Sequence, residues 1–169
     1  MRKLQGFTDE GSPGRDWNVA TGMVIEGKAG FQIMGDWAKG EFTAAGKVPG
    51  KDYYCAATPS NNGYLYNVDS FIFYKSSDPD KQAGQKLLAK LMMGKNFQKV
   101  FNLYKGSIPA RLDVSMDEFD KCAKTSNADI KTAGASGGLV PSFAHGMAQG
   151  NTMKAALQDI ITEHFNSDM

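Results

Sequence analysis

Apolar residues recur at helical spacing in five stretches of the chain. The first stretch opens at Ser12-Pro13, a favourable N-cap followed by a proline in the first turn, and Gly27 ends it. Asp78-Pro79 repeats this start signal and predicts a helix with a buried leucine stripe, which Gly94 ends.

The other three helical stretches lie further along the chain. Residues 97–104 carry aromatic and aliphatic side chains at positions i, i+3, i+4 and i+7, and Gly106 ends this pattern. Residues 115–118 form a capping box that predicts a short helix, and residues 133–138 form a loose loop after it. Asn151 can cap the last helix, whose continuous apolar face predicts that it docks on the body of the protein.

Three short apolar runs predict strands between these helices. Residues 30–35 form an apolar run between glycines, and residues 53–58 and 69–75 are rich in residues that favour an extended chain. Residues 60–63 read as the turn between the second and third runs. Strands separated by helices indicate an α/β architecture.

Composition narrows the class of protein. The chain has 169 residues, of which 41% are hydrophobic, so one ordinary core is expected. Its formal net charge of +1 gives no general attraction to nucleic acid or to anionic membranes. The apolar runs are far shorter than the roughly 20 residues that span a bilayer. No export signal precedes Leu4, so we expect that such a signal either lies outside this sequence or never existed.

The sequence offers few residues suited to catalysis. His145 and His164 are the two histidines, and His164 is most simply a residue on the face of the last helix. The sequence contains no zinc-protease motif, no nucleophile elbow and no phosphate-binding loop. The two cysteines, Cys55 and Cys122, are too few for a zinc site. They are either small buried thiols or a single bridge, and no metal or cofactor is indicated.

Sugar binding needs aromatic faces together with carboxylate, amide and cationic side chains, and five residues supply these groups. Trp37 follows an expected buried strand, where ligands sit in α/β sheets, but it also suits a core anchor. Asn67 and Asp69 precede an apolar strand and could equally be turn or cap residues. Lys105 also suits compensation of a helix dipole, and His145 also suits a partly exposed helix residue.

Five segments together carry a family resemblance that covers essentially the whole chain. They are residues 14–18, 27–41, 66–70, 104–111 and 138–145, and the second contains GKAG and MGDW around the apolar run. The chain resembles the extracellular solute-binding proteins of family 1, in particular the glucose- or mannose-type binding proteins of ABC importers.

The resemblance implies a periplasmic-binding-protein-like fold of type II, in which two α/β lobes close around the sugar. The chain resembles the C-terminal half of such a protein. Residues 1–65 would belong to the C-terminal lobe, residues 66–111 would cross into the N-terminal lobe, and residues 112–169 would return and add the terminal helix.

The family pocket, carried over to matching positions, implies a role for each candidate. Trp37 would be a stacking platform, Asp69 an acceptor for hydroxyls, and Lys105 and His145 donors, with Asn67 beside them. The resemblance also favours a disulfide between Cys55 and Cys122 in an oxidising periplasm.

The implied function is binding of a monosaccharide such as glucose, galactose or mannose for delivery to an ABC permease, in the periplasm and without enzymatic activity. Exposure of surfaces that are buried in a longer protein would favour self-association of this fragment. Two alternatives stay open at this point: a folding or oligomerisation unit that binds no sugar alone, and a sugar-metabolising α/β enzyme.

Overall fold

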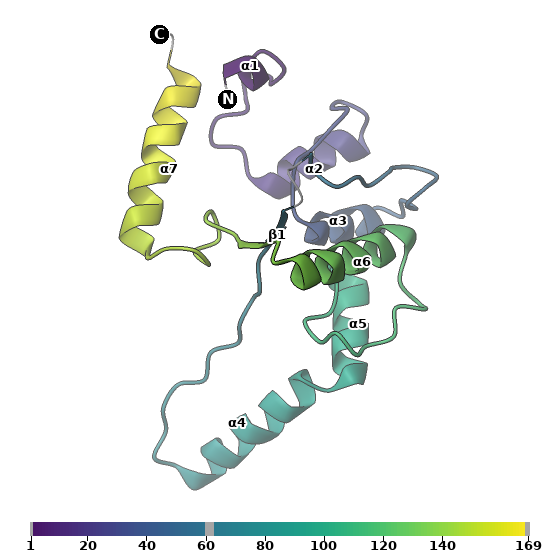
Figure 1. Ribbon diagram of the computed structural model, residues 1–169, viewed down its shortest axis with the longest axis vertical. Helices are drawn as coiled ribbons and strands as arrows, with labels where there is room; N and C mark the ends of the chain where they lie inside the picture. Colours follow the sequence, from purple (N-terminus) through teal and green to yellow (C-terminus); the bar gives the residue numbers. More distant parts are fainter. Residues whose placement is uncertain (1, 60–62, 168–169) are drawn as a thin grey trace.

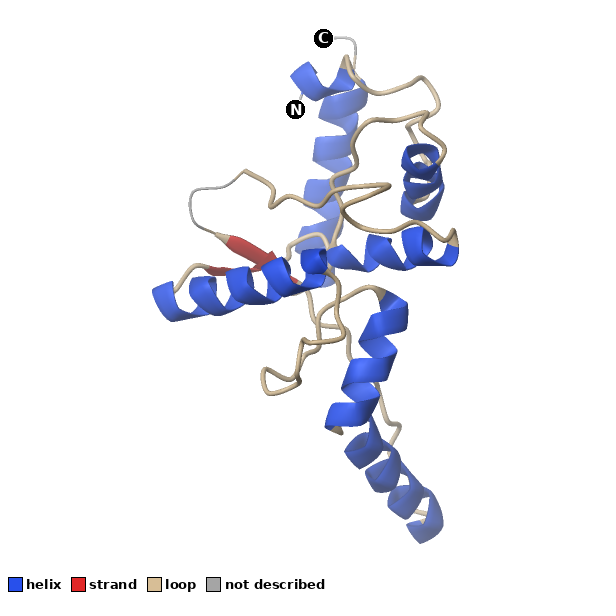
Figure 2. Ribbon diagram, turned by 90° about the vertical axis from the view of Figure 1, so that its right-hand side faces the viewer, coloured by secondary structure: helices blue, strands red, loops and turns tan. Residues whose placement is uncertain are grey.

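The structure is a computed structural model that describes residues 2–59 and 63–167. Helices dominate it, and two short strands form a parallel pair (Figures 1 and 2). The helices are α1 (Arg2–Gln5), α2 (Trp17–Ile25), the single 3₁₀ turn η1 (Asp36–Ala38), α3 (Lys39–Ala44), α4 (Pro79–Met92), α5 (Lys95–Lys105), α6 (Lys121–Ser136) and α7 (Asn151–Asn166). The expected α/β class is confirmed as a mostly helical fold with one small parallel sheet.

The two strands, β1 (Tyr64–Tyr66) and β2 (Leu139–Pro141), come from distant parts of the sequence. They pair in parallel with Tyr64 opposite Leu139, and the chain between them passes through α4, α5 and α6. The hydroxyl groups of Tyr64 and Ser126 lie 2.6 Å apart and hold α6 against β1. The carboxyl ends of both strands therefore open at the same edge of this small sheet.

A small core lies around α3 and the start of α6. Its buried apolar residues are Ala38, Phe42, Val114, Phe119, Ala123 and Ala133. The ring of Phe42 stacks on Tyr53 with 4.2 Å between centroids. In Figure 1 the chain leaves this body after β1, runs out in an extended segment and returns through α4, while α7 stands on the opposite side near α1.

The helix ends that are marked by local signals agree with the sequence predictions. The carboxylate of Asp78 accepts hydrogen bonds from the backbone N–H groups of Asp80 and Lys81 at the start of α4. Gly27 and Gly106 end α2 and α5 in the left-handed conformation that favours glycine.

The start of α2 was predicted four residues too early. Arg15 forms two hydrogen bonds to the carboxylate of Asp9, which fold residues 9–15 into turns. Gly14 has a φ of 75°, which a helix does not allow, so the helix begins only at Trp17 after Asp16 as N-cap.

The three expected strands are wrong. Residues 30–35, 53–58 and 69–75 are irregular, and Phe31 is 96% exposed. A strand needs the backbone groups of a neighbour, and among the described residues none of these segments pairs with a strand. The predicted turn at residues 60–63 falls mostly on residues 60–62, which lie outside the described residues.

The expected capping box at residues 115–118 does not form. The hydroxyl of Ser115 bonds to Asp117 instead, and the carboxylate of Glu118 pairs with Lys99 at 2.6 Å. The helix starts later, at α6, where the Asp120 side chain accepts from the backbone N–H of Ala123. Because α6 continues to Ser136, the loop expected at 133–138 is also wrong for most of its length.

The buried faces expected on two helices are largely exposed. In α4, Leu87 is 71% exposed, and in α7, Ile160 is 60% exposed. The last helix starts at Asn151 with Gly150 as N-cap, one position from the expected start, and it packs mainly against α1 rather than on the core. The apolar periodicity thus marks the helices correctly, but this chain does not supply the surfaces that would cover them.

The disulfide between Cys55 and Cys122 is present and joins the irregular segment after Tyr53 to the first turn of α6, with 5.6 Å between the Cα atoms. The two residues are 67 positions apart, so replacing both by alanine is expected to lower the free energy of unfolding by about 4 kcal/mol. Urea denaturation under non-reducing conditions measures this loss. Two alkylated thiols in protein that was never reduced would contradict the bridge.

Candidate functional site

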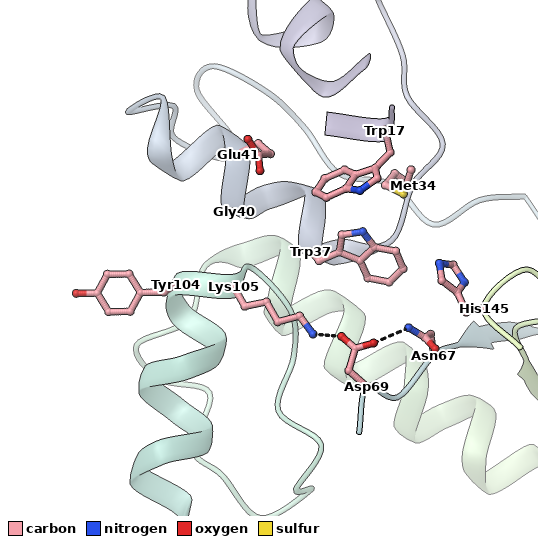
Figure 3. Close-up of a pocket in the computed structure, with 10 residues that line it drawn as sticks. All are labelled: Trp17, Met34, Trp37, Gly40, Glu41, Asn67, Asp69, Tyr104, Lys105 and His145. Atoms are coloured by element: carbon pink, nitrogen blue, oxygen red, sulfur yellow. Dashed lines mark hydrogen bonds and ion pairs between the residues drawn. The ribbon is translucent and has the colours of Figure 1, made fainter. Parts of the chain in front are cut away.

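An open hollow of about 700 Å³ lies beyond the carboxyl ends of β1 and β2 (Figure 3). All five residues proposed from the sequence line it, although they come from four separate segments. The lining consists of Trp17, Met34, Trp37, Gly40, Glu41, Asn67, Asp69, Tyr104, Lys105 and His145.

The segment 36–40 places Trp37 because its neighbours bind residues 105–120. The carboxylate of Asp36 accepts from the backbone N–H of Ile108 at 2.9 Å. The ammonium group of Lys39, whose side chain is 8% exposed, pairs with Asp120 at 2.8 Å. Because the side chains of Asp36 and Lys39 are both held on residues 105–120, the indole ring of Trp37 between them faces the hollow.

The backbones of α3 and of the end of α5 approach closely at two glycines. A Cβ atom on Gly40 would lie 2.8 Å from the carbonyl oxygen of Lys105. A Cβ atom on Gly106, which has a φ of 88°, would lie 2.5 Å from the backbone nitrogen of Gly40. Glycine at both positions therefore allows the last turn of α5 to lie against α3, which brings Lys105 to the hollow.

Three polar side chains of the hollow, those of Lys105, Asp69 and Asn67, form a short row (Figure 3). The ammonium group of Lys105 pairs with the carboxylate of Asp69, which also accepts from the amide of Asn67 at 3.1 Å. The hydrogen bond from Lys105 is the main cause that holds the pKa of Asp69 below its ordinary value, so this carboxyl is ionised at neutral pH.

Asp36 lies behind the hollow and differs from Asp69 in its environment. Burial raises the pKa of its carboxyl, while the N–H of Ile108 and the positive charges of Lys39 and Lys105 act in the opposite direction. Its hydrogen bond to Ile108 makes it a structural acceptor and not a group that faces a ligand.

His145 enters the hollow from the turn that follows β2. Its ring meets Trp37 edge to face, with 5.2 Å between centroids and an interplanar angle of 83°. Its Nδ1 atom lies 2.7 Å from the hydroxyl oxygen of Ser142. Trp37, Asp69 and His145 thus line one hollow although they come from three separate segments.

Sequence reasoning did not assign several lining residues to the site. Trp17 lies in the first helical stretch of the sequence, and its ring lies beside Met34 and Trp37 in Figure 3. Its position in the segment 14–18, which helped to carry the resemblance, was the available signal. Tyr104 lines the margin with its ring pointing away from the other side chains, and it is 80% exposed.

This arrangement suits binding of a polar molecule with apolar faces. Indole rings can cover C–H faces, and the row of carboxylate, amide and ammonium groups can bond to hydroxyls. Within the described part of the chain, no three His, Cys, Asp or Glu side chains gather in a way that could hold a metal ion. None of the described helices is both long and apolar enough to cross a membrane.

Comparison with known proteins identifies the family to which the chain belongs. Residues 1–132 match the family of bacterial extracellular solute-binding proteins. The chain is 46% identical over 170 residues to a probable sugar-binding periplasmic protein of Brucella suis and 45% identical over 170 residues to one of Rhizobium meliloti. It is 32% identical over 137 residues to the xylose/arabinose-binding protein of Haloferax volcanii, with 78% of this chain and 28% of the relative covered.

The chain belongs to the bacterial extracellular solute-binding protein family. These proteins are non-enzymatic components of transport, so the sequence prediction that the chain is not an enzyme is confirmed, and the periplasmic location agrees with the relatives' names. The match takes in the whole chain but only about 40% of the length of the Brucella and Rhizobium relatives.

Two helical glycines test the close contact between α3 and α5. Gly40→Ala is expected to lower the free energy of unfolding by about 1 to 3 kcal/mol, since the new methyl group would press on the backbone of Lys105. Gly84→Ala in α4 is the matched control, because a Cβ there meets nothing within 4 Å. That control is expected to be neutral or to stabilise by up to about 1 kcal/mol. Equal effects of the two substitutions in urea denaturation would show that the contact is unimportant.

Proposed function

We propose that the hollow binds an uncharged monosaccharide of the glucose type, and that the chain is part of the periplasmic sugar-binding component of an ABC importer. The observation that carries the proposal is the meeting of Trp37 with the row Asn67, Asp69 and Lys105 and with His145 in one hollow. An aromatic face opposite hydroxyl-bonding groups is the combination that a sugar ring requires.

The relatives support the choice of a sugar as ligand. Two are named as probable sugar-binding periplasmic proteins, and a third is named for xylose and arabinose. The glucose-type assignment rests on the resemblance of the signature segments, and so does the type II fold with two lobes. The division into residues 1–65, 66–111 and 112–169 belongs to the same proposal. The path of the chain out from β1 and back through α4 and α5 is compatible with a segment that crosses between lobes.

The charges in the hollow favour a neutral ligand. Among its lining residues, Lys105 contributes one positive charge and Asp69 and Glu41 contribute two negative ones, which sum to −1 with a neutral histidine. The ammonium group of Lys105 is already paired with Asp69, so it is not free to neutralise a phosphate or a sugar acid. An anionic sugar would therefore meet repulsion without a dedicated counter-charge.

A titration with sugars of different charge tests the proposal. We expect glucose, galactose or mannose to bind to this chain more weakly than micromolar, because an open hollow cannot exclude water from the hydrogen bonds. Glucose 6-phosphate is expected to bind at least about tenfold more weakly than glucose, a difference of about 1.4 kcal/mol. Xylose and arabinose complete the panel, and NMR titration measures all affinities. Preference for the phosphorylated sugar would contradict the proposed ligand class.

The open hollow also favours a second candidate function: a unit that folds or associates but binds no sugar alone. A cooperative thermal melt together with no saturable response to any sugar in the panel would select this alternative.

Alanine substitutions test the proposed roles of the site residues. Trp37→Ala is expected to weaken sugar binding about tenfold, since stacking removes apolar surface from water at about 25 cal/mol per Å². Asp69→Ala should weaken sugar binding by the next largest amount, because an ionised carboxylate accepts charge-assisted hydrogen bonds. Alanine at Lys105 or His145 should cause smaller losses of affinity. Tyr74→Ala is the aromatic control and should leave affinity unchanged, because Tyr74 is 83% exposed and is not among the residues that line the hollow.

The alternative role of Trp37 as a core anchor predicts a different result. In that case Trp37→Ala would lower the free energy of unfolding by several kcal/mol, as large aromatic truncations in cores do, and would leave sugar affinity unchanged.

A further inference from the structure

Ser142 is held rigidly beside the hollow, at the end of β2. The residue is 1% exposed. Its backbone N–H donates to the carbonyl oxygen of Tyr66 at 2.8 Å, which extends the pairing of the two strands, and its carbonyl oxygen accepts from the N–H of Met147 at 2.9 Å. Backbone contacts on both sides therefore fix the point from which its side chain extends.

The hydroxyl of Ser142 makes two contacts, and both are with His145. Its oxygen accepts from the backbone N–H of His145 at 3.4 Å. The same oxygen lies 2.7 Å from the Nδ1 atom of the imidazole ring. Among the residues that the structure describes, nothing else accepts the hydroxyl hydrogen of this buried serine.

These two contacts determine which atom donates in the hydrogen bond between the Ser142 hydroxyl and Nδ1. If Nδ1 carried a hydrogen and donated, the hydroxyl hydrogen of Ser142 would be buried without an acceptor, which costs about 1 to 3 kcal/mol. If the hydroxyl donates to Nδ1, both the hydroxyl group and Nδ1 are satisfied. Nδ1 is then a bare acceptor, and the hydrogen of the neutral imidazole resides on Nε2.

The opposite nitrogen, Nε2, makes no hydrogen bond to any described residue. The contact of Nδ1 with Ser142 orients the imidazole ring, which meets Trp37 edge to face. Nε2, on the other side of the ring from Nδ1, is therefore available to a molecule in the hollow. On this side of the hollow a ligand meets an N–H donor, whereas across it the ligand meets the carboxylate acceptor of Asp69.

We propose that Ser142 is a positioning residue that fixes His145 in the Nε2–H form, so that His145 donates a hydrogen bond to a hydroxyl oxygen of the bound sugar. This inference rests on the proposed function for its ligand, but the state of the imidazole can be tested without one.

NMR of the ¹⁵N-histidine-labelled chain at about pH 8.5, two units above the ordinary histidine pKa of about 6.5, tests the state of the ring. The chain has two histidines, and His164→Ala assigns their signals. We expect His145 to show the Nε2–H form alone, whereas His164, on the exposed α7, shows shifts averaged over both forms. Ser142→Ala should move His145 to the averaged pattern, and Ser142→Thr should restore the single form. An Nδ1–H form in the unmodified chain, or averaged shifts there, would overturn the inference.

Sugar affinity provides the second measurement. Ser142→Ala is expected to weaken binding of the sugar that the unmodified chain binds by three- to tenfold, and Ser142→Thr to restore most of the loss. Ser136→Ala is the matched control, because that hydroxyl bonds to carbonyl groups within α6 and does not reach His145. Full affinity in Ser142→Ala, beside reduced affinity in His145→Ala, would contradict the positioning role. Absence of sugar binding in a chain with the expected imidazole signals would count against the proposed function alone.

Discussion

The contact between the backbones of α3 and α5 at Gly40 and Gly106 is the constraint on which most of the site depends. A side chain at either glycine would collide with backbone atoms, so the two helices could not approach to this distance. Two further polar contacts support this arrangement: Asp36 accepts from Ile108, just after α5, and Lys39 pairs with Asp120, the N-cap of α6. The signature segment around MGDW therefore mainly connects two parts of the chain, and its residues Met34 and Trp37 line the hollow.

The parallel pair of strands supplies the other half of the site. Each strand has only three residues, but their pairing brings together segments more than seventy positions apart. Asn67 and Asp69 follow β1, and Ser142 and His145 follow β2. Both pairs of polar residues therefore lie at the carboxyl edge of the sheet, where α/β proteins bind ligands. Residues that the sequence separates widely thus meet because of one short ladder of backbone hydrogen bonds.

The sequence predicted the parts of the structure that depend on local interactions. The cap at Asp78 and the stop at Gly106 act over one helical turn, and both are observed. The expected strands at residues 30–35 and 69–75 failed because pairing depends on neighbours that are distant in sequence. The five candidate residues that line the hollow were proposed from the resemblance and from their chemistry, whereas the part proposed for Ser142 depends on a buried contact that no spacing reveals. The capping box at residues 115–118 failed because Glu118 finds a partner in Lys99, nineteen residues away.

The exposed apolar faces and the open hollow have one explanation. Leucines of α4, aromatic residues of the segment 69–75 and the face of α7 are all accessible, although their periodicity is that of buried elements. The matched relatives are much longer, with this chain spanning about 40% of the Brucella protein. Under the proposed function, further residues of a polypeptide of that length would cover these faces and close the hollow from the other side. Trp37 and the polar row would then orient the sugar, while the opposing wall would exclude water and strengthen every hydrogen bond that they make.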